Sequence, residues 1–191
     1  MQIKKDDIQN KILSVAEKLF IKNGYDDTSL KMIADRSYIS KSNIYRYYSS
    51  KEEIYETLVG SARAEIAKLM IVFFTVDFIG KYTPEKCEEI SSILAKLMSN
   101  HRSGMLIMLR SNAKNDRNLI EQAIIGKFIE ACPIDDEGAK ELISKIIIFG
   151  LTDILLKYSD EESIAKELKI LIYYHYLGLD GVKRKIDEIT R

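Results

Sequence analysis

The chain has 191 residues, of which 46% are hydrophobic and 30% are charged, so it can build a core and stay in solution. Its two prolines and nine glycines favour a mostly helical protein, and its formal net charge of zero excludes attraction to nucleic acid through overall charge alone. The most apolar run, at 146–156, is too short to span a bilayer, so we expect no membrane segment and no targeting signal.

The first helix is predicted from apolar residues that recur at helical spacing, and Gly24 follows as its C-terminal end. These residues are Ile8, Ile12, Val15, Ala16, Leu19 and Phe20. Thr28 is expected to cap a short second helix, and a third helix should begin near Ser40 after a short break. Ser50 and Glu53 have the spacing of a capping box, which predicts a long fourth helix directly after Ser50.

The second half of the chain also shows helical periodicity. Helices are expected at about 84–98, 104–112, 119–129, 137–158 and 161–178. Pro84 fits the first turn of its helix, and Thr83 can cap that helix. Gly178 is expected to end the last long helix, with a short charged helix after it. Because no alternating strand pattern is present, the predicted fold class is all-α.

Positive charge is concentrated in residues 28–51, which carry five basic side chains and one acidic side chain. These are Lys31, Arg36, Lys41, Arg46 and Lys51, against Asp35. The same stretch holds a cluster of tyrosines at 45, 47 and 48. A buried core is a poor place for so much polarity, and a solvated surface is a poor place for so much aromatic area.

The third helix can be laid out at about 100° per residue with Ile44 facing inward. This directs Ser42, Asn43 and Arg46 outward. Tyr48 and Ser40 then fall near the inward face. The flanks hold Lys41, Tyr45 and Tyr47.

Two short helices joined by a tight turn are the layout of a helix-turn-helix, whose second helix enters the major groove of DNA. The outward residues have the chemistry for base edges and phosphates. A flanking tyrosine can pack its ring against the domain and present its hydroxyl to a phosphate. The alternative interpretation is a solvated helix whose aromatic residues simply pack.

Residues 12–54 resemble the N-terminal DNA-binding domain of TetR-family transcriptional regulators. The matching residues are Leu19-Phe20, Gly24-Tyr25, Thr28-Ser29, Ile33-Ala34, Ser40-Lys41, Ile44-Tyr45, Tyr47-Tyr48 and Ser50-Lys51-Glu52. The resemblance implies a three-helix helix-turn-helix domain at 1–50. A helical ligand-binding and dimerisation domain would follow at 51–191, linked by the fourth helix.

Double-stranded operator DNA is the partner that this resemblance implies. The predicted DNA-binding residues are Thr28, Ser29, Lys41, Ser42, Asn43, Tyr45, Arg46, Tyr47 and Lys51. Lys51 is expected to contact a phosphate at the N-terminus of the fourth helix, where free N–H groups favour an anion. Asn43 and Arg46 have the bidentate donor chemistry of base readout.

Two positions depart from the family pattern. Glycine is usual at the turn position of Tyr38, because that position favours a left-handed backbone, which is uncommon for tyrosine. Glycine is also usual at the position of Ser42. The first departure bears on the geometry of the turn, and the second adds a hydroxyl where the backbone would approach DNA closely.

Such regulators dimerise through their last two long helices, here about 137–158 and 161–178. The predicted interface residues are Ile147, Leu151, Ile154 and Leu155. The alternative is that the very apolar helix at 137–158 is a fully buried central helix. The resemblance also implies an inducer pocket, for which the candidates are Phe73, Phe74, Phe78, Met98, Met105 and Met108. Core packing is the alternative for each of these side chains.

No catalytic or cofactor motif is present, so we expect neither an enzyme nor a cofactor. Cys87 and Cys132 lack metal or redox spacing and are expected to be reduced thiols in a cytoplasmic protein. His101 and His175 have no partners at metal-ligand spacing.

The sequence therefore predicts a homodimeric regulator, which we expect to be a repressor released from its operator by a small, largely apolar inducer. One alternative is a helical ligand-binding protein of the same fold with weakened DNA binding, suggested by Tyr38. Another is an all-helical enzyme, which would need a convergent polar site.

Overall fold

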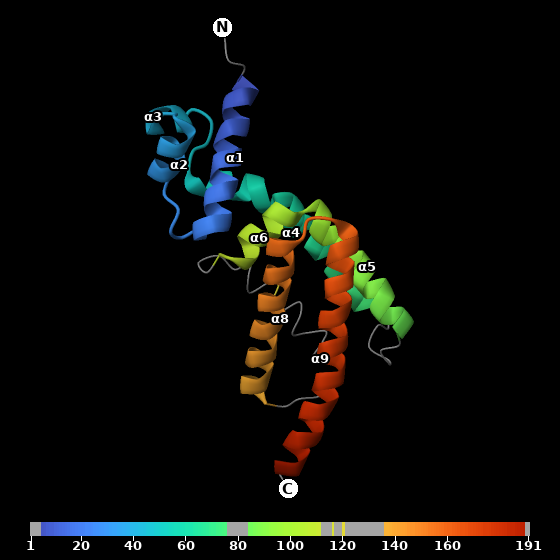
Figure 1. The fold of residues 1–191 in the computed structure, drawn as a ribbon. Coiled ribbons are helices and arrows are strands. Elements are labelled where there is room, and N and C mark those ends of the chain that lie inside the picture. The colour runs from blue at the N-terminus through green and yellow to red at the C-terminus, as the bar shows by residue number, and fades with distance from the viewer. Residues whose placement is uncertain (1–4, 76–83, 112–115, 117–119, 121–135, 190–191) are drawn as a thin grey trace. The chain divides into compact units, whose positions relative to one another are not determined.

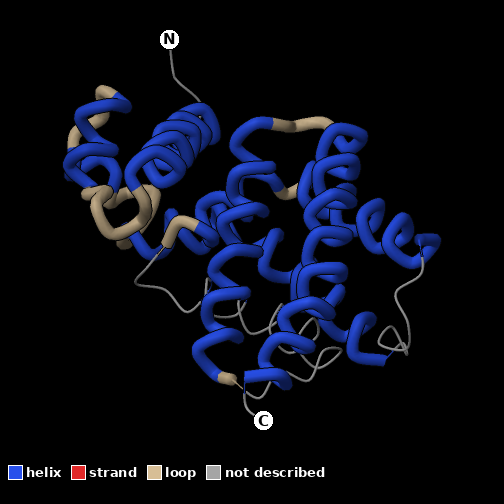
Figure 2. Tube along the Cα trace, turned by 60° about the horizontal axis from the view of Figure 1, so that its bottom comes forward, coloured by secondary structure: helices blue, strands red, loops and turns tan. Residues whose placement is uncertain are grey.

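The computed structural model describes residues 5–75, 84–111, 116, 120 and 136–189. Within these ranges the chain forms helices and loops and no strand (Figure 2), which confirms the all-α prediction there. The helices are α1 (Lys5–Asn23), α2 (Leu30–Ser37), α3 (Lys41–Ile44), α4 (Lys51–Thr75), α5 (Pro84–Asn100), α6 (Arg102–Leu109), α8 (Glu137–Lys157) and α9 (Glu161–Ile189) (Figure 1).

The chain divides into two compact units. The first unit comprises Met1–Ala64 and Ser103–Arg117, and the second comprises Glu65–Arg102 and Asn118–Arg191. The division falls within α4, after the predicted domain boundary at residue 50, and it assigns α6 to the unit that carries the helix-turn-helix. The predicted division at 50 concerns function and stays a prediction.

The core of the first unit gathers side chains from α1, α2, α3, α4 and α6. Its buried apolar residues include Ile12, Ala16, Leu19, Phe20, Ile33, Ile44, Tyr48, Ile54, Tyr55, Val59 and Leu106. Three aromatic rings pack edge to face or tilted at its centre: Tyr25 and Tyr55 lie 4.8 Å apart between centroids, and Phe20 lies 5.5 Å from Tyr25. Gly104 lets α6 approach α4 closely, because a Cβ there would lie 2.9 Å from the Cβ of Ala62.

In the second unit, α9 packs against both α5 and α8. Cys87, Ile90 and Ile172 form a buried cluster between α5 and α9, and Lys169 makes an ion pair with Glu88 beside it. Gly150 allows α8 and α9 to pack tightly, since a Cβ there would meet the Leu171 side chain at 2.9 Å.

Most helix starts agree with the sequence predictions, but the ends of α6 and α9 differ from them. Gly24 follows α1 with φ +85° and so ends that helix as expected. Gly178 was predicted to end the last long helix, but α9 continues through it to Ile189. The reason is conformational: among the described glycines only Gly24 has a positive φ, so Gly178 keeps a helical backbone and lowers helix propensity without terminating the helix.

Two further expectations concern the middle of the chain. The short helix predicted at 104–112 is α6 and begins and ends slightly earlier, at Arg102 and Leu109. The helix predicted at 119–129 lies almost wholly outside the described residues. Among the residues that are described, no helix combines the length and apolar character needed to cross a membrane.

Candidate nucleic-acid interface

The turn between α2 and α3 keeps a left-handed residue although it has no glycine. Tyr38 has φ 56° and ψ 35°. The N–H of Tyr38 donates to the Asp35 carbonyl at 3.3 Å, and the N–H of Ile39 donates to the Ala34 carbonyl at 3.1 Å. This pair of bonds is a Schellman motif, which normally places glycine at the left-handed position. The departure at Tyr38 therefore leaves the turn geometry intact.

A serine cap starts α3 directly after this turn. The Ser40 hydroxyl accepts a hydrogen bond from the N–H of Asn43 at 3.2 Å, and Ser40 has the extended backbone of an N-cap. The hydroxyls of Ser40 and Ser42 lie 3.1 Å apart. The structure exposes Ser40, whereas the helical layout placed it near the inward face, because its side chain caps the helix instead of packing.

The burial of residues 41–48, which comprise α3 and the turn after it, agrees with most of the predicted orientation, except that Asn43 is less exposed than expected. Ile44 and Tyr48 are buried. Lys41, Ser42, Tyr45 and Arg46 are exposed, and Asn43 and Tyr47 are half-buried. The outward side chains thus present an ammonium, a hydroxyl, an amide and a guanidinium on one short element. These are the groups that bind phosphate oxygens and base edges.

Tyr45 explains how an exposed aromatic residue fits this polar surface. Its side chain is 49% exposed, and the Lys41 Nζ lies 5.9 Å from the centroid of its ring. That distance is within the range of a cation–π interaction. Tyr48, by contrast, is only 5% exposed and belongs to the core. The tyrosine cluster therefore divides between the core and the polar surface.

Thr28 does not have the role that the sequence predicted. It is 1% exposed, and its hydroxyl donates to the carbonyls of Gly24 at 2.7 Å and Leu19 at 3.3 Å. The N-cap of α2 is Ser29, whose hydroxyl accepts from the N–H of Met32 at 3.2 Å. Thr28 therefore stabilises the end of α1 and is not available to DNA, whereas Ser29 is exposed.

The start of α4 is capped as expected, with one difference in register. The Ser50 hydroxyl accepts from the N–H of Glu53 at 3.2 Å. The Glu53 carboxylate accepts from the N–H and hydroxyl of Ser49, at 2.6 and 2.7 Å, and these bonds lower the pKa of Glu53. A capping box would direct this carboxylate to the N–H of Ser50.

Lys51 lies at this helix start but its ammonium is engaged within the chain. Its Nζ donates to the Tyr25 carbonyl at 2.8 Å and lies 3.9 Å from the centroid of the Tyr25 ring. The interaction joins α4 to the loop between α1 and α2. The contacts that the structure shows for Lys51 are thus structural. We therefore keep the phosphate contact of Lys51 as a proposal that adds to a structural role.

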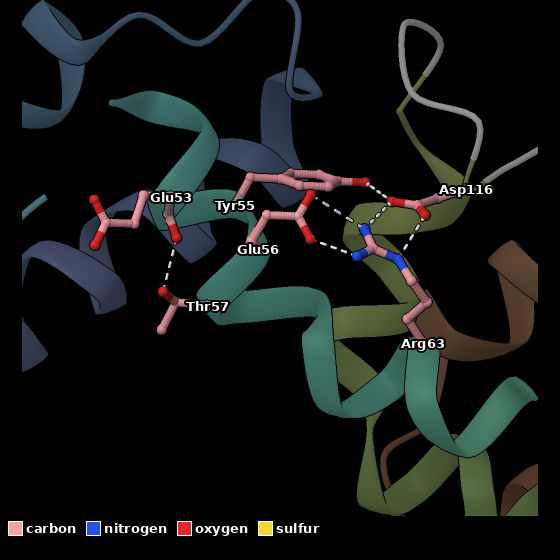
Figure 3. A network of polar contacts seen from close by, with 6 residues as sticks. All are labelled: Glu53, Tyr55, Glu56, Thr57, Arg63 and Asp116. Atoms are coloured by element: carbon pink, nitrogen blue, oxygen red, sulfur yellow. Dashed lines mark hydrogen bonds and ion pairs between the residues drawn. The ribbon is translucent and has the colours of Figure 1, made fainter. Parts of the chain in front are cut away.

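A buried polar network joins α4 to Asp116, after α6, within the first unit (Figure 3). Asp116 is 4% exposed and accepts a 2.6 Å hydrogen bond from the Tyr55 hydroxyl. Arg63 donates to both oxygens of Asp116 at 2.8 and 2.7 Å, and its guanidinium also pairs with Glu56. Since a buried carboxylate requires such partners, the three bonds explain how Asp116 stays in the core.

The network raises the pKa values of both Tyr55 and Arg63. Burial, and then the hydrogen bond to Asp116, raise the pKa of Tyr55 above its usual range. Hydrogen bonds to Asp116 and Glu56 raise the pKa of Arg63. Tyr55 therefore stays a neutral donor and Arg63 a cation. Sequence reasoning missed this network, since its members are far apart in the chain and follow no periodic pattern.

The described part of the chain offers no alternative site for metal chemistry. No three histidine, cysteine, aspartate or glutamate side chains gather there as a metal-binding group. Cys87 is buried and unpaired, and burial raises the pKa of its thiol. Cys132 and the side chain of His175 lie outside the described residues.

The six predicted pocket residues do not form one described cluster. Met98, Met105 and Met108 are buried, but Met98 belongs to the second unit and the other two belong to the first. The side chains of Phe73 and Phe74, and the whole of Phe78, lie outside the described residues. The assignment of these six residues to an inducer pocket stays a prediction.

The N-terminal residues match a known family. Residues 12–58 fit the family described as "Bacterial regulatory proteins, tetR family". Over 48 residues the chain is 44% identical to the HTH-type transcriptional regulator QacR of Staphylococcus aureus. That match covers 25% of this chain and 26% of QacR, so it spans about a quarter of the relative's length.

Solved structures extend the likeness to the whole chain at the level of fold. A TetR-like transcriptional regulator from Rhodococcus sp. RHA1 has a TM-score of 0.54 and 16% identity, covering 93% of this chain and all of the other (100%). A TetR-family transcriptional regulator from Bordetella parapertussis 12822 has a TM-score of 0.57 and 17% identity, covering 91% of this chain and 97% of the other.

These comparisons confirm the predicted resemblance. Residues 12–58 match the N-terminal domain model of the tetR family, and the chain has the fold of TetR-like transcriptional regulators. Each protein named above is described as a transcriptional regulator.

Proposed function

We propose that the protein is a homodimeric transcriptional regulator that binds operator DNA through α3 and acts as a ligand-released repressor. One observation carries the DNA-binding part: α3 follows an intact left-handed turn, and α3 and the turn after it present Lys41, Ser42 and Arg46 to solvent while Ile44 anchors the helix in the core. A helix held this way can enter a major groove with its polar side chains foremost.

The side chains at this surface divide into two proposed roles. Asn43 and Arg46 read base edges, because an amide and a guanidinium can each make two hydrogen bonds to one base. The other proposed contacts are to phosphates and come from Ser29, Lys41, Ser42, Tyr45, Tyr47 and Lys51. Phosphate contacts position the domain and give affinity, whereas base contacts give sequence preference.

Dimerisation through α8 and α9 is supported by exposed apolar side chains, but the residues differ from those first predicted. Ile147, Ile154 and Leu155 are buried within the single chain, and Leu151 is half-buried. They pack the second unit and do not form an outer surface. The exposed apolar residues of α8 are Leu142, Ile146, Phe149 and Leu156, and those of α9 are Ile170 and Tyr174.

These α8 residues recur at intervals of four, three and seven positions, so they lie along one side of the helix. Phe149, at 74% exposed, has the most exposed side chain among them. Such a row is unusual on a protein that stays monomeric, and a second copy of the same helices would cover it. The proposed interface therefore consists of this exposed row.

Ligand control is proposed from the family fold. A ligand that prefers one arrangement of the two DNA-binding domains shifts the population toward that arrangement. Release from the operator would follow if the preferred arrangement spaces the α3 helices wrongly for successive major grooves, roughly 34–36 Å apart. The small, largely apolar inducer and the cytoplasmic location, where DNA is found, belong to the same proposal.

The alternative function is a ligand-binding protein of this fold with weakened DNA binding. Tyr38 was the main reason to consider it, and the left-handed turn at Tyr38 removes that reason. Titration of the protein against a fluorescent duplex from its own promoter region, with a shuffled duplex as control, separates the two functions. We expect tighter binding to the promoter duplex and an affinity that falls steeply with salt. Equal, weak binding to both duplexes at every salt concentration would favour the alternative.

Repression is tested separately by transcription in vitro from the same promoter. Added protein should lower transcript yield if it is a repressor and raise it if it is an activator. An Arg36→Ala variant is a matched control for substitutions in α3, because Arg36 is an exposed arginine of α2 outside the proposed contacts.

A further inference from the structure

Tyr38 combines an unfavourable backbone conformation with a side chain that is almost fully exposed to solvent. Among the described residues it is the one non-glycine residue with a positive φ, and its side chain is 90% exposed. A left-handed conformation is costly for a residue with a Cβ, and glycine would adopt it freely. Because the ring is exposed, burial of apolar surface within the chain does not offset this cost. The domain therefore maintains at this position a side chain that its own folding does not require.

Conformations of this kind persist where a function uses them, so the surroundings of Tyr38 indicate its use. The Lys11 Nζ, on α1, lies 5.8 Å from the centroid of the Tyr38 ring. Lys11 is exposed as well. The turn thus presents an aromatic ring, a phenolic hydroxyl and an ammonium together, and it does so immediately before the Ser40 cap of α3.

The same combination occurs on α3 itself, where Lys41 lies over the ring of Tyr45 at 5.9 Å. Two lysine–tyrosine pairs with exposed rings therefore occur in the first unit, one on the proposed recognition segment and one at the turn that precedes it, besides the pair of Lys51 with the buried Tyr25. The ammonium beside each ring favours an anionic partner. The exposed apolar side chains suited to self-association lie instead on α8 and α9 of the second unit.

We propose that Tyr38 and Lys11 form a contact to the sugar–phosphate backbone of duplex DNA, outside the recognition helix. This inference rests on the proposed function. The ring packs against a deoxyribose, the hydroxyl donates to a phosphate oxygen and the ammonium neutralises a phosphate. Because no base edge is read, the contact adds affinity and fixes the approach of α3 without adding sequence preference.

The test uses Tyr38→Gly in the full-length protein, since glycine keeps the turn and removes the side chain. We expect the Tm to rise while the affinity for the promoter duplex falls roughly tenfold, and falls equally for the shuffled duplex. Tyr38→Asn gives a second route, because asparagine tolerates the left-handed region and also lacks the ring. Tyr38→Phe isolates the hydroxyl and should lose less affinity than either.

Lys11→Ala should lower the slope of log affinity against log salt by roughly one unit. Lys18→Ala is the matched control: Lys18 is exposed on α1 two turns further along, and its removal should leave the slope close to that of the wild type. A double variant of Lys11 and Tyr38 should lose less than the sum of the single losses in binding free energy, because the two side chains act on one contact.

The outcomes separate this inference from the proposed function. If the wild type binds the promoter duplex and Tyr38→Gly binds it equally well or better, the contact does not exist although DNA binding stands. If Lys11→Ala and Lys18→Ala change the slope equally, Lys11 has no special place in the contact. If the wild type shows no preference for promoter DNA at any salt concentration, the proposed function fails and this contact fails with it.

Discussion

The Tyr55 hydroxyl and the Asp116 carboxylate meet at 2.6 Å although 61 positions separate them in the chain. The bond joins α4 to the segment after α6 and lies within the core of the first unit. Because Tyr55 also contacts the rings of Phe20 and Tyr25, the bond places Asp116 beside this aromatic cluster. The stability of the DNA-binding domain therefore depends on residues well beyond the segment that resembles a helix-turn-helix.

Tyr55→Phe removes the hydroxyl of this bond and keeps the ring. We expect the free energy of unfolding of the first unit to fall by about 1.5–3 kcal/mol, because a buried charged acceptor loses one donor. Urea unfolding monitored by circular dichroism measures the loss. Tyr45→Phe is the control at a half-exposed tyrosine and should be nearly neutral. Equal effects of the two variants would show that the Asp116 bond adds nothing.

Arg63→Met should be more damaging than Asp116→Asn. Arg63→Met leaves the Asp116 carboxylate in the core with fewer partners, which should lower the free energy of unfolding by about 3 kcal/mol. In Asp116→Asn, the asparagine still accepts from Tyr55, and the partly exposed Arg63 stays paired with Glu56. For Asp116→Asn we expect a loss of about 1–2 kcal/mol. Unfolding curves of both variants decide the order, and the reverse order would contradict the assigned pairing.

Thr28→Val tests the correction at the start of α2. The substitution keeps the shape of a buried side chain and removes the hydroxyl that donates to the Gly24 and Leu19 carbonyls, so stability should fall by about 1 kcal/mol. Thr57→Val, at an exposed threonine of α4, is the control and should cost less. Because Thr28 is buried, the salt dependence of DNA binding should not change. A shallower slope would restore Thr28 as a phosphate contact.

Arg46→Ala should reduce the sequence preference at one base pair of the operator and leave the preference at the other positions unchanged. A bidentate base contact is worth about 1–3 kcal/mol of discrimination, and its loss relaxes the preference at that position. Selection of binding sites from a random duplex library measures the preference. Asn43→Ala is expected to relax a different position, and Arg36→Ala should leave the preference unchanged. An unaltered library profile for Arg46→Ala would assign Arg46 to the phosphates.

Phe149→Lys should prevent dimerisation, because it places a charge in the exposed apolar row of α8. Light scattering at micromolar concentration should give twice the 22.0 kDa chain mass for the wild type and a single chain mass for the variant. Glu141→Lys is the control, since Glu141 is an exposed residue of α8 outside the row. Operator affinity should fall with the loss of the dimer. A wild-type mass of one chain would contradict the proposed dimer.

Local signals in the sequence predicted most of the helices and the orientation of α3. Gly24 and Pro84 mark helix boundaries through backbone properties that hold in any context, and the burial of Ile44 and Tyr48 follows from helical periodicity. Thr28 was misassigned because threonine and serine both cap helices and stand side by side. Only the fold shows that the hydroxyl of Thr28 is directed into the core.

The support for the site could not be predicted, because it depends on contacts between distant positions. Asp116 and Arg63 carry no local signal of their pairing, and each would ordinarily be assigned to the surface. Lys51 was expected to contact a phosphate, and its sequence position gave no sign that its ammonium donates to the Tyr25 carbonyl. The exposed row that includes Phe149 was also missed, because an apolar helix does not reveal from its sequence which of its sides is covered.

The α3 helix contains only four residues, Lys41–Ile44, so it makes barely one turn of helix. A segment this short cannot maintain a helical conformation alone, since nucleation is unfavourable and few hydrogen bonds follow it. Its shape depends on the Ser40 cap and on the anchoring of Ile44 and Tyr48 in the core. A synthetic peptide of residues 40–48 would therefore be largely unstructured in water, and grafting these residues onto another helix would transfer their chemistry without their geometry.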